Sequence, residues 1–463
     1  MRYLIIGVVL LTACAGEGAA ADTTVTTGAP ETSTSAAPEV FTPSAAEYPP
    51  APEVPEGPLI AETEEAIDRL VTDLFTTDWD LDAVDALVEA GDARTAWVIA
   101  DLLRFYQRGV ETETLAAAFV DLTGAEWEPG EVEFVWASNH LIAWDLPAWD
   151  GYPSAKRQIF GPLEETWDRF FEEDHSIDWR LVTWGGVAPD KRPLDENTDC
   201  GCIPALDHPA TTDAEGGDWY PDREIVFGVV VGDEPIALPK NQMEVHEMVH
   251  VTLGGRELGI PYCTLCGSAQ AYYVDEVPGI DRVVLRTSGL LSRSNKLMYD
   301  LTTGSAIDTF TGKALSGSLA ADGVTLEQVS VVASTWGDWK DAHPDTSIIA
   351  EDGGIGRTYV EDPLGGRDAA GPIFPVGDID SRLPGQEKVV GVIRDDGTPV
   401  AFPVEDARAA LAEDEIQFEG LTARLEDSIR IYDSDGSEVV SHESYWFAWS
   451  QFHQGTLLWT PEG

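Results

Sequence analysis

Between Ala61 and Leu122, apolar residues recur at three- and four-residue spacing, while acidic residues occupy most of the other positions. This spacing places the apolar side chains on one face of an α-helix. Gly91 and Asp92 separate two such runs, and glycine commonly ends a helix because it tolerates the left-handed conformation. The pattern therefore predicts an α-helical domain over residues 59–125.

The run GDARTAWVIADLLRFYQ at 91–107 resembles one helix of a HEAT-type repeat. Two units are fewer than such an array normally needs, so a plain helical bundle is the alternative. The next segment, 126–199, is dense in tryptophan between Trp127 and Trp184. Aromatic clusters of this kind usually pack in cores or between domains, and we interpret the segment as a Trp-rich helical connector.

From Ile203 onward the pattern changes to short β-branched runs punctuated by Gly, Asp and Pro. Examples are the runs at 225–231, 281–286, 388–393 and 427–433. Runs of this length and composition are typical of β-strands. The fold class expected for the whole chain is therefore α+β, with a small helical domain followed by a β-rich domain.

The β-rich part also repeats itself. VFGVVVGDEPIALP at 226–239 is similar to VVGVIRDDGTPVAFP at 389–403, and the pattern W-x2-W-x3-H-x2-T begins at both Trp336 and Trp446. Two motifs that recur in the same order indicate two copies of one unit. We expect unit A over 200–352 and a shortened unit B over 353–463, with the tryptophans serving a structural role.

The repeat also predicts a helix at the most polar-rich motif of unit A. In unit B, VEDARAALAED follows Pro403 and has the acidic first turn and the alanines of a helix. By analogy, we expect residues 240–251 after Pro239 to be helical. His246 and His250 would then lie one turn apart on the same helix face.

The N-terminus has the features of an export signal. Arg2 precedes an apolar run at 4–11, which is too short to span a bilayer. Leu11-Thr12-Ala13-Cys14 resembles the lipobox of bacterial lipoproteins, which implies cleavage before Cys14 and its acylation. We therefore expect a signal peptide at 1–14 and a Thr/Ala/Pro/Glu-rich tether at 15–58 that holds the protein outside the cytoplasm at the membrane. An ordinary secretory signal is the alternative.

Net charge excludes one class of partner. The formal charge is −55 at pH 7 and the sequence pI is about 4.1. A chain with this much negative charge is repelled by nucleic acid and by anionic lipid headgroups. We therefore expect neither as a ligand. The charge indicates a solvated surface and does not identify a protein partner.

Possible metal ligands are concentrated between residues 239 and 268. This stretch contains His246, Glu247, His250 and the pair Cys263 and Cys266. Imidazole and thiolate are preferred ligands of zinc and copper. A disulfide within this C-x2-C motif, or between it and the C-x-C motif of Cys200 and Cys202, is the alternative, because an even number of cysteines outside the cytoplasm favours oxidation.

His246-Glu247-Met248-Val249-His250 also matches the HExxH motif of zinc peptidases. In such a site both histidines bind zinc and Glu247 acts as the general base, with an acidic residue such as Glu276 as third ligand. Neither a third histidine nor a clear downstream glutamate helix follows the motif.

From about 202 to 459 the chain resembles the bacterial family of domain of unknown function 3179. The resemblance is carried by GVVVGDEPIALP, VHEMV, PYCTLCGSAQAY, SGLLSRSNKLMYD, TWGDWKDAHPDT and YWFAWSQFHQGTLLW. In that family the second motif reads His-Glu-x-Val-Asn, so His246 and Glu247 match it, while His250 stands where asparagine is usual. The resemblance thus favours a site of His246, Cys263 and Cys266 over a peptidase, and it supplies no activity.

Three functional hypotheses result. The first is a lipoprotein that binds zinc or copper, or does thiol-redox work, through His246, Cys263 and Cys266. Further candidate ligands are His250, Cys200, Cys202 and His343, although His343 fits a turn cap better. The second is a non-catalytic surface scaffold with structural disulfides, and the third is the HExxH peptidase. Whether the protein is an enzyme, and what its protein partner is, stay open.

Overall fold

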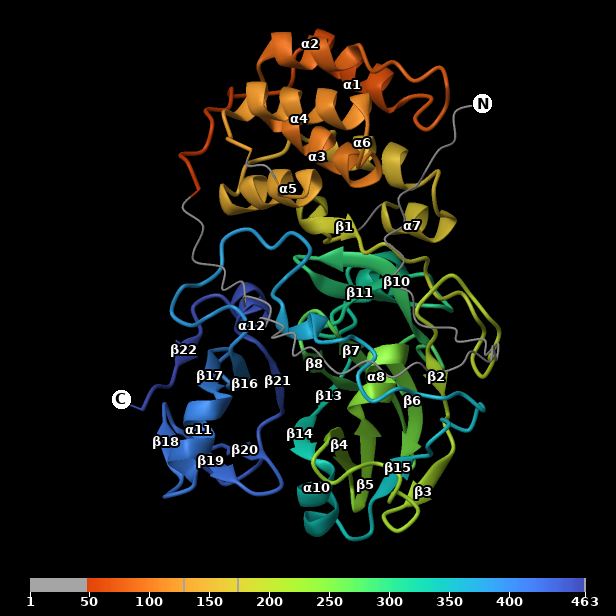
Figure 1. Cartoon of the computed structure of the whole chain (residues 1–463), viewed down its shortest axis with the longest axis vertical. Coiled ribbons are helices and arrows are strands. Elements are labelled where there is room, and N and C mark those ends of the chain that lie inside the picture. The colour runs from red at the N-terminus through yellow and green to blue at the C-terminus, as the bar shows by residue number, and fades with distance from the viewer. Residues whose placement is uncertain (1–47, 128–129, 173–174, 462–463) are drawn as a thin grey trace, which may run out of the picture.

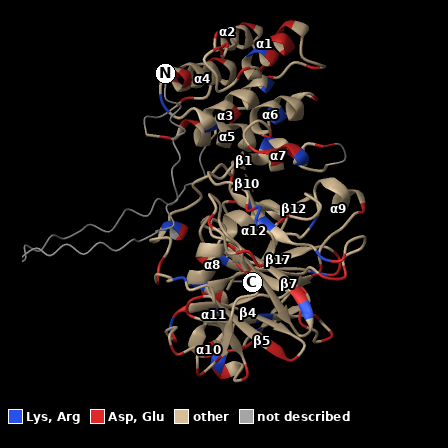
Figure 2. Cartoon of the chain, turned by 90° about the vertical axis from the view of Figure 1, so that its right-hand side faces the viewer, with Lys and Arg blue, Asp and Glu red and all other residues tan. Residues whose placement is uncertain are grey.

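The computed structural model describes residues 48–127, 130–172 and 175–461. The predicted signal peptide and Cys14 lie outside these residues, as does most of the predicted tether. The described chain has a helical part at one end and a β-rich part at the other (Figure 1). In this portion no helix is both long and apolar enough to cross a membrane. Acidic side chains are spread over both parts and do not gather in one patch (Figure 2).

The helical part holds the first seven α-helices. They are α1 (Ala61–Val71), α2 (Ala83–Ala90), α3 (Ala96–Phe105), α4 (Val110–Thr123), α5 (Glu133–Ala143), α6 (Tyr152–Phe160) and α7 (Glu165–Phe170), with 3₁₀ turns at Ala93–Thr95 and Trp179–Leu181. Helix α3 is the centre of this part, because every residue from Ala96 to Arg104 is buried. A helix that is buried on all sides must be surrounded by other elements, and α4, α5 and α6 pack against it.

One hydrophobic core runs through the whole helical part and into the β-rich part. It joins side chains of the first helices with Trp136, Trp167 and Trp179 of the tryptophan-rich segment. Leu290 and Tyr299 of the β-rich part belong to the same core. The tryptophans therefore pack as core residues, and apolar contacts fix the helical part to the β-rich part.

The strands of the described residues form five small sheets. The strands are β1 (Val182–Trp184), β2 (Leu206–Asp207), β3 (Thr211–Asp213), β4 (Ile225–Val231), β5 (Glu234–Pro239), β6 (Met248–Leu253), β7 (Arg256–Cys263), β8 (Ser268–Ala269), β9 (Ala271–Tyr273), β10 (Leu285–Ser292), β11 (Asn295–Asp300), β12 (Ala306–Asp308), β13 (Gln328–Val329), β14 (Val332–Thr335), β15 (Ser347–Ile349), β16 (Lys388–Ile393), β17 (Pro399–Pro403), β18 (Ile416–Phe418), β19 (Leu421–Leu425), β20 (Ile429–Tyr432), β21 (Ser441–Tyr445) and β22 (Leu457–Leu458). The helices among them are α8 (Lys240–His246), α9 (Gly317–Ala321), α10 (Trp336–Ala342), α11 (Val404–Leu411) and α12 (Trp446–Phe452), with a 3₁₀ turn at Arg367–Ala369.

Two of the five sheets have the same construction. One has the strand order β14-β4-β5-β15, extended by β3, and the other has the order β21-β16-β17-β22. In both, the first two pairings are antiparallel and the third is parallel. A helix follows the second strand of the central hairpin in each, α8 after β5 and α11 after β17. These sheets contain the sequence segments that are similar to each other.

A tryptophan packed on a glycine explains the repeated W-x2-W-x3-H-x2-T pattern. The Trp339 ring lies on Gly228, and the Trp449 ring lies on Gly391; a Cβ at either glycine would be 2.1 Å from the ring. The two indole Nε1 atoms donate to the threonine that ends each motif, at 2.9 and 3.0 Å. Both rings are buried, so the repeated tryptophans are structural.

The helix predicted over 240–251 is shorter than expected. Helix α8 ends at His246, Glu247 takes the left-handed conformation with φ of 51°, and β6 begins at Met248. The reason is the β-branched composition of 249–252, which favours a strand, together with full pairing of β6 to β7 from Met248 to Leu253. The prediction that His246 and His250 share a helix face was therefore wrong.

Candidate dithiol site

The C-x2-C motif forms a tight turn between two paired strands. Strand β7 ends at Cys263 and β8 begins at Ser268, and Cys266 N–H donates to the carbonyl of Cys263 at 3.2 Å. Gly267 has a φ of 59°, and a Cβ there would be 2.7 Å from the ring of Tyr445. Only glycine fits this close approach without strain. The turn therefore packs closely against Tyr445, at the end of β21.

The two thiols are free and close together. The Sγ atoms of Cys263 and Cys266 are 3.0 Å apart. Cys266 also lies 3.3 Å from the side-chain oxygen of Asn295. Cys263 is 2% exposed and Cys266 is not exposed at all. They pack in a hydrophobic cluster with side chains of unit B that include Trp446.

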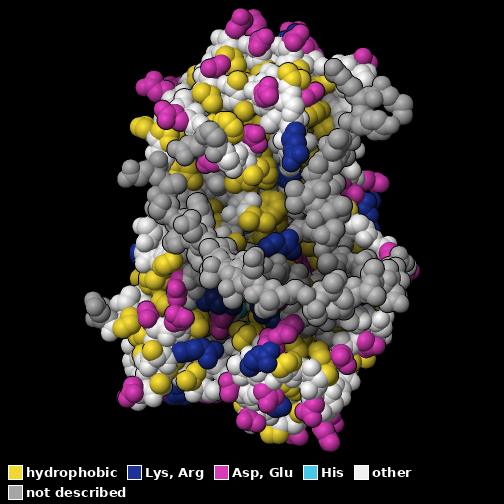
Figure 3. Space-filling model, in the orientation of Figure 1, with side chains coloured by type: hydrophobic (Ala, Val, Ile, Leu, Met, Phe, Trp, Pro, Cys, Tyr) yellow, Lys and Arg dark blue, Asp and Glu magenta, His cyan; other side chains and the backbone are white. Residues whose placement is uncertain are grey.

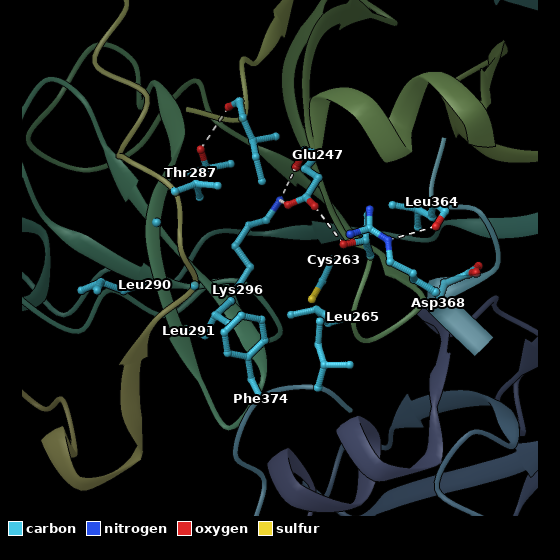
Figure 4. Close-up of a pocket in the computed structure, with 17 residues that line it drawn as sticks. Glu247, Cys263, Leu265, Thr287, Leu290, Leu291, Lys296, Leu364, Asp368 and Phe374 are labelled. Carbon is cyan, nitrogen blue, oxygen red and sulfur yellow. Dashed lines mark hydrogen bonds and ion pairs between the residues drawn. The ribbon is translucent and has the colours of Figure 1, made fainter. Parts of the chain in front are cut away.

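A cavity of about 80 Å³ lies beside this turn, and Cys263 lines it whereas Cys266 does not. A single water needs roughly 10–15 Å³ by this measure, so the cavity can hold several waters or a small organic group. Its other walls are mainly apolar: Leu265 of the turn, Leu290 and Leu291 of β10, and Phe374 line it (Figure 4).

The cavity lies where the two parts of the molecule meet. Leu290 and Leu291, on β10, belong to the core that the sheet shares with the helices. Hydrophobic side chains also gather at the centre of one face of the molecule, between the helical and the β-rich parts (Figure 3). Ile373 lines the cavity and is 47% exposed, so one wall of the cavity reaches the surface.

A buried ion pair lies beside Cys263. Lys296 is 5% exposed, and its Nζ is 2.8 Å from a carboxylate oxygen of Glu247. The same ammonium donates to the backbone carbonyls of Glu247 and Tyr262, at 2.6 and 2.7 Å. Thr264, inside the C-x2-C turn, donates its hydroxyl to Glu247 at 2.9 Å. Every hydrogen of the ammonium therefore has an acceptor, and the pair is tied to the turn.

Local backbone geometry places both charged groups. Glu247 follows the last residue of α8 in the left-handed conformation, which directs the chain from the helix into β6. Lys296 follows a hairpin turn whose central residues Arg293 and Ser294 have φ of 48° and 63°, as in the tight turns that join twisted antiparallel strands. Figure 4 shows the two side chains meeting above Cys263.

The two thiols differ in acidity. Burial raises the pKa of Cys263, but the hydrogen bond from Cys266, the Lys296 charge and the Lys296 backbone N–H outweigh this, so that its pKa is lowered. Burial and the neighbouring Cys263 sulfur raise the pKa of Cys266 well above its usual range. Glu247 raises the pKa of both thiols. The thiol that faces the cavity is thus the one that ionises first.

His246 does not reach these sulfurs. Its Nδ1 is 2.7 Å from the carbonyl oxygen of Pro204, which can only accept, so Nδ1 carries the proton. Its Nε2 then accepts from the hydroxyl of Tyr359 at 2.7 Å. Burial lowers the pKa of this ring to about 4. The imidazole is therefore neutral, with both nitrogens in use.

The other candidate ligands are also dispersed. His250 donates from Nδ1 to Asp207 at 2.9 Å, and its Nε2 is buried without a partner. His343 Nε2 lies 2.8 Å from Asp427, so this ring nitrogen is already paired with a carboxylate. The side chain of Glu276 is 79% exposed, beside Arg256. The side chains of the HExxH motif thus do not converge as in a zinc peptidase.

Cys200 and Cys202 form a disulfide with each other. Across residues 48–127, 130–172 and 175–461, one group of three ligand-type side chains has all its ligand atoms within 4.8 Å, namely Asp190 with these two cysteines. Two sulfurs joined in a disulfide are not thiolates and bind metal poorly. Asp190 is also paired with Arg192 at 2.7 Å. His246, Cys263 and Cys266 do not make a comparable group.

Sequence reasoning found both cysteines and Glu247 but missed Lys296 and Asn295. Lysine is common on surfaces, and only the pairing of β10 with β11 brings this one to the C-x2-C turn. The available signal was a lysine inside the strand-like run NKLMYD at 295–300, where β11 is buried along its whole length. A lysine in such a strand needs a specific partner.

Comparisons with known proteins give one match. The family described as "Protein of unknown function (DUF3179)" matches residues 200–435, slightly more than half of the chain. No curated protein and no solved structure matches. The matched region contains both pairs of cysteines, the Glu247–Lys296 pair and the cavity wall of β10. The resemblance noted in the sequence is thereby confirmed, and the chain belongs to the DUF3179 family.

Proposed function

We propose that Cys263 and Cys266 form a redox-active dithiol in an exported protein that is anchored to the membrane through Cys14. The observation that carries this proposal is the pair of sulfurs 3.0 Å apart, of which only Cys263 lines a cavity. A disulfide bond is about 2.05 Å long, so the sulfurs need to approach each other by only roughly 1 Å. The turn already holds them in suitable positions.

The electrostatics support the same reaction. Thiolates, not thiols, attack disulfides and other sulfur electrophiles. Lys296 stabilises the thiolate of Cys263, which faces the space where a substrate would lie. Cys266 keeps its proton until a mixed disulfide forms and then displaces the substrate thiol. Glu247 raises the pKa of both thiols and so helps Cys266 to keep its proton until that step.

The proposed location fits this chemistry. Disulfides persist outside the cytoplasm, and the chain contains one, between Cys200 and Cys202. A lipid anchor at Cys14, followed by the predicted Thr/Ala/Pro/Glu-rich tether, would keep the dithiol at the outer surface of the membrane, near other exported proteins. The helical part, whose resemblance to a HEAT-type repeat stays a proposal, would then serve as a rigid support for the cavity.

Metal binding by the two thiols is the second candidate. It is favoured by the closeness of the sulfurs and by the Asn295 oxygen 3.3 Å from Cys266, since two thiolates are good ligands for copper(I) and zinc. The third ligand expected from the sequence, His246, instead contacts Pro204 and Tyr359. The redox proposal requires no such ligand and is therefore preferred.

The test is a redox titration of the full chain with Cys14→Ser, which removes the unacylated thiol. The protein is equilibrated in glutathione buffers of increasing oxidising power, the free thiols are alkylated, and the peptides are identified by mass spectrometry. We expect a reversible transition in which Cys263 and Cys266 become oxidised together. Elemental analysis of the same sample measures bound zinc and copper.

The outcomes separate the hypotheses. Stoichiometric zinc or copper that protects both thiols from alkylation would favour the metal site. Thiols that stay reduced across the whole titration, without metal, would refute the redox proposal and leave the scaffold hypothesis.

A further inference from the structure

The disulfide of Cys200 and Cys202 lies next to the same cavity as Cys263. Cys202 immediately precedes Ile203, and Ile203 lines the cavity. Ala188 pairs with Cys202 as an isolated bridge, next to Val187, which also lines the cavity. Cys263 thus lines the cavity directly, and Cys202 is the chain neighbour of a residue that lines it.

The two pairs differ sharply in accessibility. Cys263 and Cys266 are almost completely buried, so the surface of another protein cannot reach them directly. Cys200 is exposed, and so is the chain from Asp195 to Gly201 that leads to it. Exposed disulfides are more easily reduced than buried ones. A redox partner of protein size would therefore meet the exposed pair first.

The segment around the C-x-C pair is anchored on both sides, by the Asp195 N–H to Asp207 at 3.0 Å and by His246 to the Pro204 carbonyl at 2.7 Å. Between these anchors the hydrogen bonds are longer. The Ala188 N–H donates to Gly201 at 3.2 Å, and Thr287 donates its hydroxyl to Ile203 at 3.2 Å. Stronger contacts lie further back, where Asp190 and Arg192 are buried and paired. Breaking the bonds at Gly201 and Ile203 would let the stretch between these anchors move toward the cavity, since a typical hydrogen bond contributes about 1 kcal/mol.

We infer that the two pairs form an internal disulfide relay, in which Cys200 and Cys202 exchange electrons with Cys263 and Cys266 across the cavity. This rests on the proposed function, because it needs a redox-active Cys263. It adds the route by which the buried dithiol communicates with thiols or disulfides of another protein at the surface.

The exchange balances within the chain. The Cys263 thiolate attacks the Sγ of Cys202, the Cys200–Cys202 bond breaks, and Cys200 leaves as a thiolate. Cys266 then loses its proton and attacks Cys263, which releases Cys202 as a thiolate. Two electrons pass to the C-x-C pair, and the two protons lost by the buried pair end on Cys200 and Cys202. No outside oxidant is required.

The intermediate can be trapped. In the full chain with Cys14→Ser, Cys200→Ser and Cys266→Ser leave Cys202 and Cys263 as the only thiols of the two pairs. Mild oxidation of the dilute, folded chain should join them, and mass spectrometry of unreduced peptides should find that link. The matched control carries Cys200→Ser with Cys263→Ser, and the buried Cys266 that it retains should give no comparable link.

A second measurement uses the Cys14→Ser chain with its other four cysteines intact, in case the trapping variants do not fold. The protein is prepared with Cys200–Cys202 oxidised and the buried thiols reduced, and is kept free of other thiols. The relay predicts that the disulfide moves to Cys263–Cys266 within one chain, and therefore at a rate that does not change on dilution. The relay alone would be overturned if the buried pair titrates with glutathione but neither redistribution nor the trapped link is found. If the buried pair never oxidises, the proposed function would be overturned as well.

Discussion

Replacing Lys296 with methionine tests whether this buried ammonium sets the acidity of Cys263. The substitution keeps much of the side-chain volume and removes one positive charge and its three hydrogen bonds. Because that charge stabilises the thiolate, its loss should raise the pKa of Cys263. The thiol would then react more slowly at neutral pH.

The size of the effect follows from the geometry. The Lys296 ammonium is 2.7 Å from the carbonyl of Tyr262, the residue before Cys263, and its charge lowers the pKa of the Cys263 thiol. Two unit charges at roughly 6 Å interact by about 2–3 kcal/mol when the effective dielectric constant is about 20. Since about 1.4 kcal/mol corresponds to a factor of ten, the pKa of Cys263 should rise, and the thiolate fraction at neutral pH should fall by roughly 10- to 100-fold.

The assay is the pH dependence of alkylation of Cys263 by a small reagent, followed by peptide mass spectrometry. The double variant Glu247→Gln/Lys296→Met is needed as well, since the single substitution leaves a buried carboxylate without its partner, which typically costs about 3–5 kcal/mol of stability. Glu247 raises the same pKa that Lys296 lowers, so the double variant should shift it less than the single one. Lys313→Met is the matched control and should leave the profile unchanged, because Lys313 is exposed and does not line the cavity.

A profile that does not move in the Lys296→Met variant, in a chain that unfolds as cooperatively as the parent, would refute this reasoning. The thiolate would then be stabilised by the hydrogen bond from Cys266 and by backbone groups alone.

Further predictions concern the acidity of the site and the stability of the fold. Glu247→Gln alone should lower the pKa of both buried thiols, which the same alkylation assay measures at each cysteine. Gly391→Ala should destabilise the chain by about 1–3 kcal/mol or more in urea unfolding, because the added methyl group would overlap the ring of Trp449; unchanged stability would mean that the ring shifts freely. Stability should be fully present above about pH 6.5 and fall as the pH decreases toward 4, because the pKa of His246 is lowered to about 4 in the folded chain and the unfolded chain takes up the proton first. This ring alone accounts for roughly 2–3 kcal/mol between pH 7 and 4.5, and His246→Asn should reduce the pH dependence by that amount.

Hydrophobic spacing predicted the helices and the strand-rich part, because each element buries one face and therefore shows its own period. The similarity of 226–239 and 389–403 was informative for the same reason: the glycines under Trp339 and Trp449 and the threonines that bind the indoles are required by one packing arrangement. Local sequence carries such information wherever the contacts repeat.

The site was less predictable because its contacts are distant in sequence. Helix α8 was expected to include His250, but the pairing of β6 with β7, which no local pattern encodes, ends it at His246. Lys296 reaches Glu247 only through the fold of β10 and β11. The cysteines were identified as a pair, whereas the bond between Cys200 and Cys202 was not predicted.

The shared construction of the β4–β5 and β16–β17 sheets bears on how the chain evolved. Two sheets of identical strand order, each with an indole seated on a glycine, point to descent from one ancestral unit that was copied and fused. The β21-β16-β17-β22 sheet keeps this strand order and contains no cysteine, so the arrangement does not depend on thiol chemistry. A reactive turn could therefore evolve beside one of the two sheets while the other sheet kept its packing role.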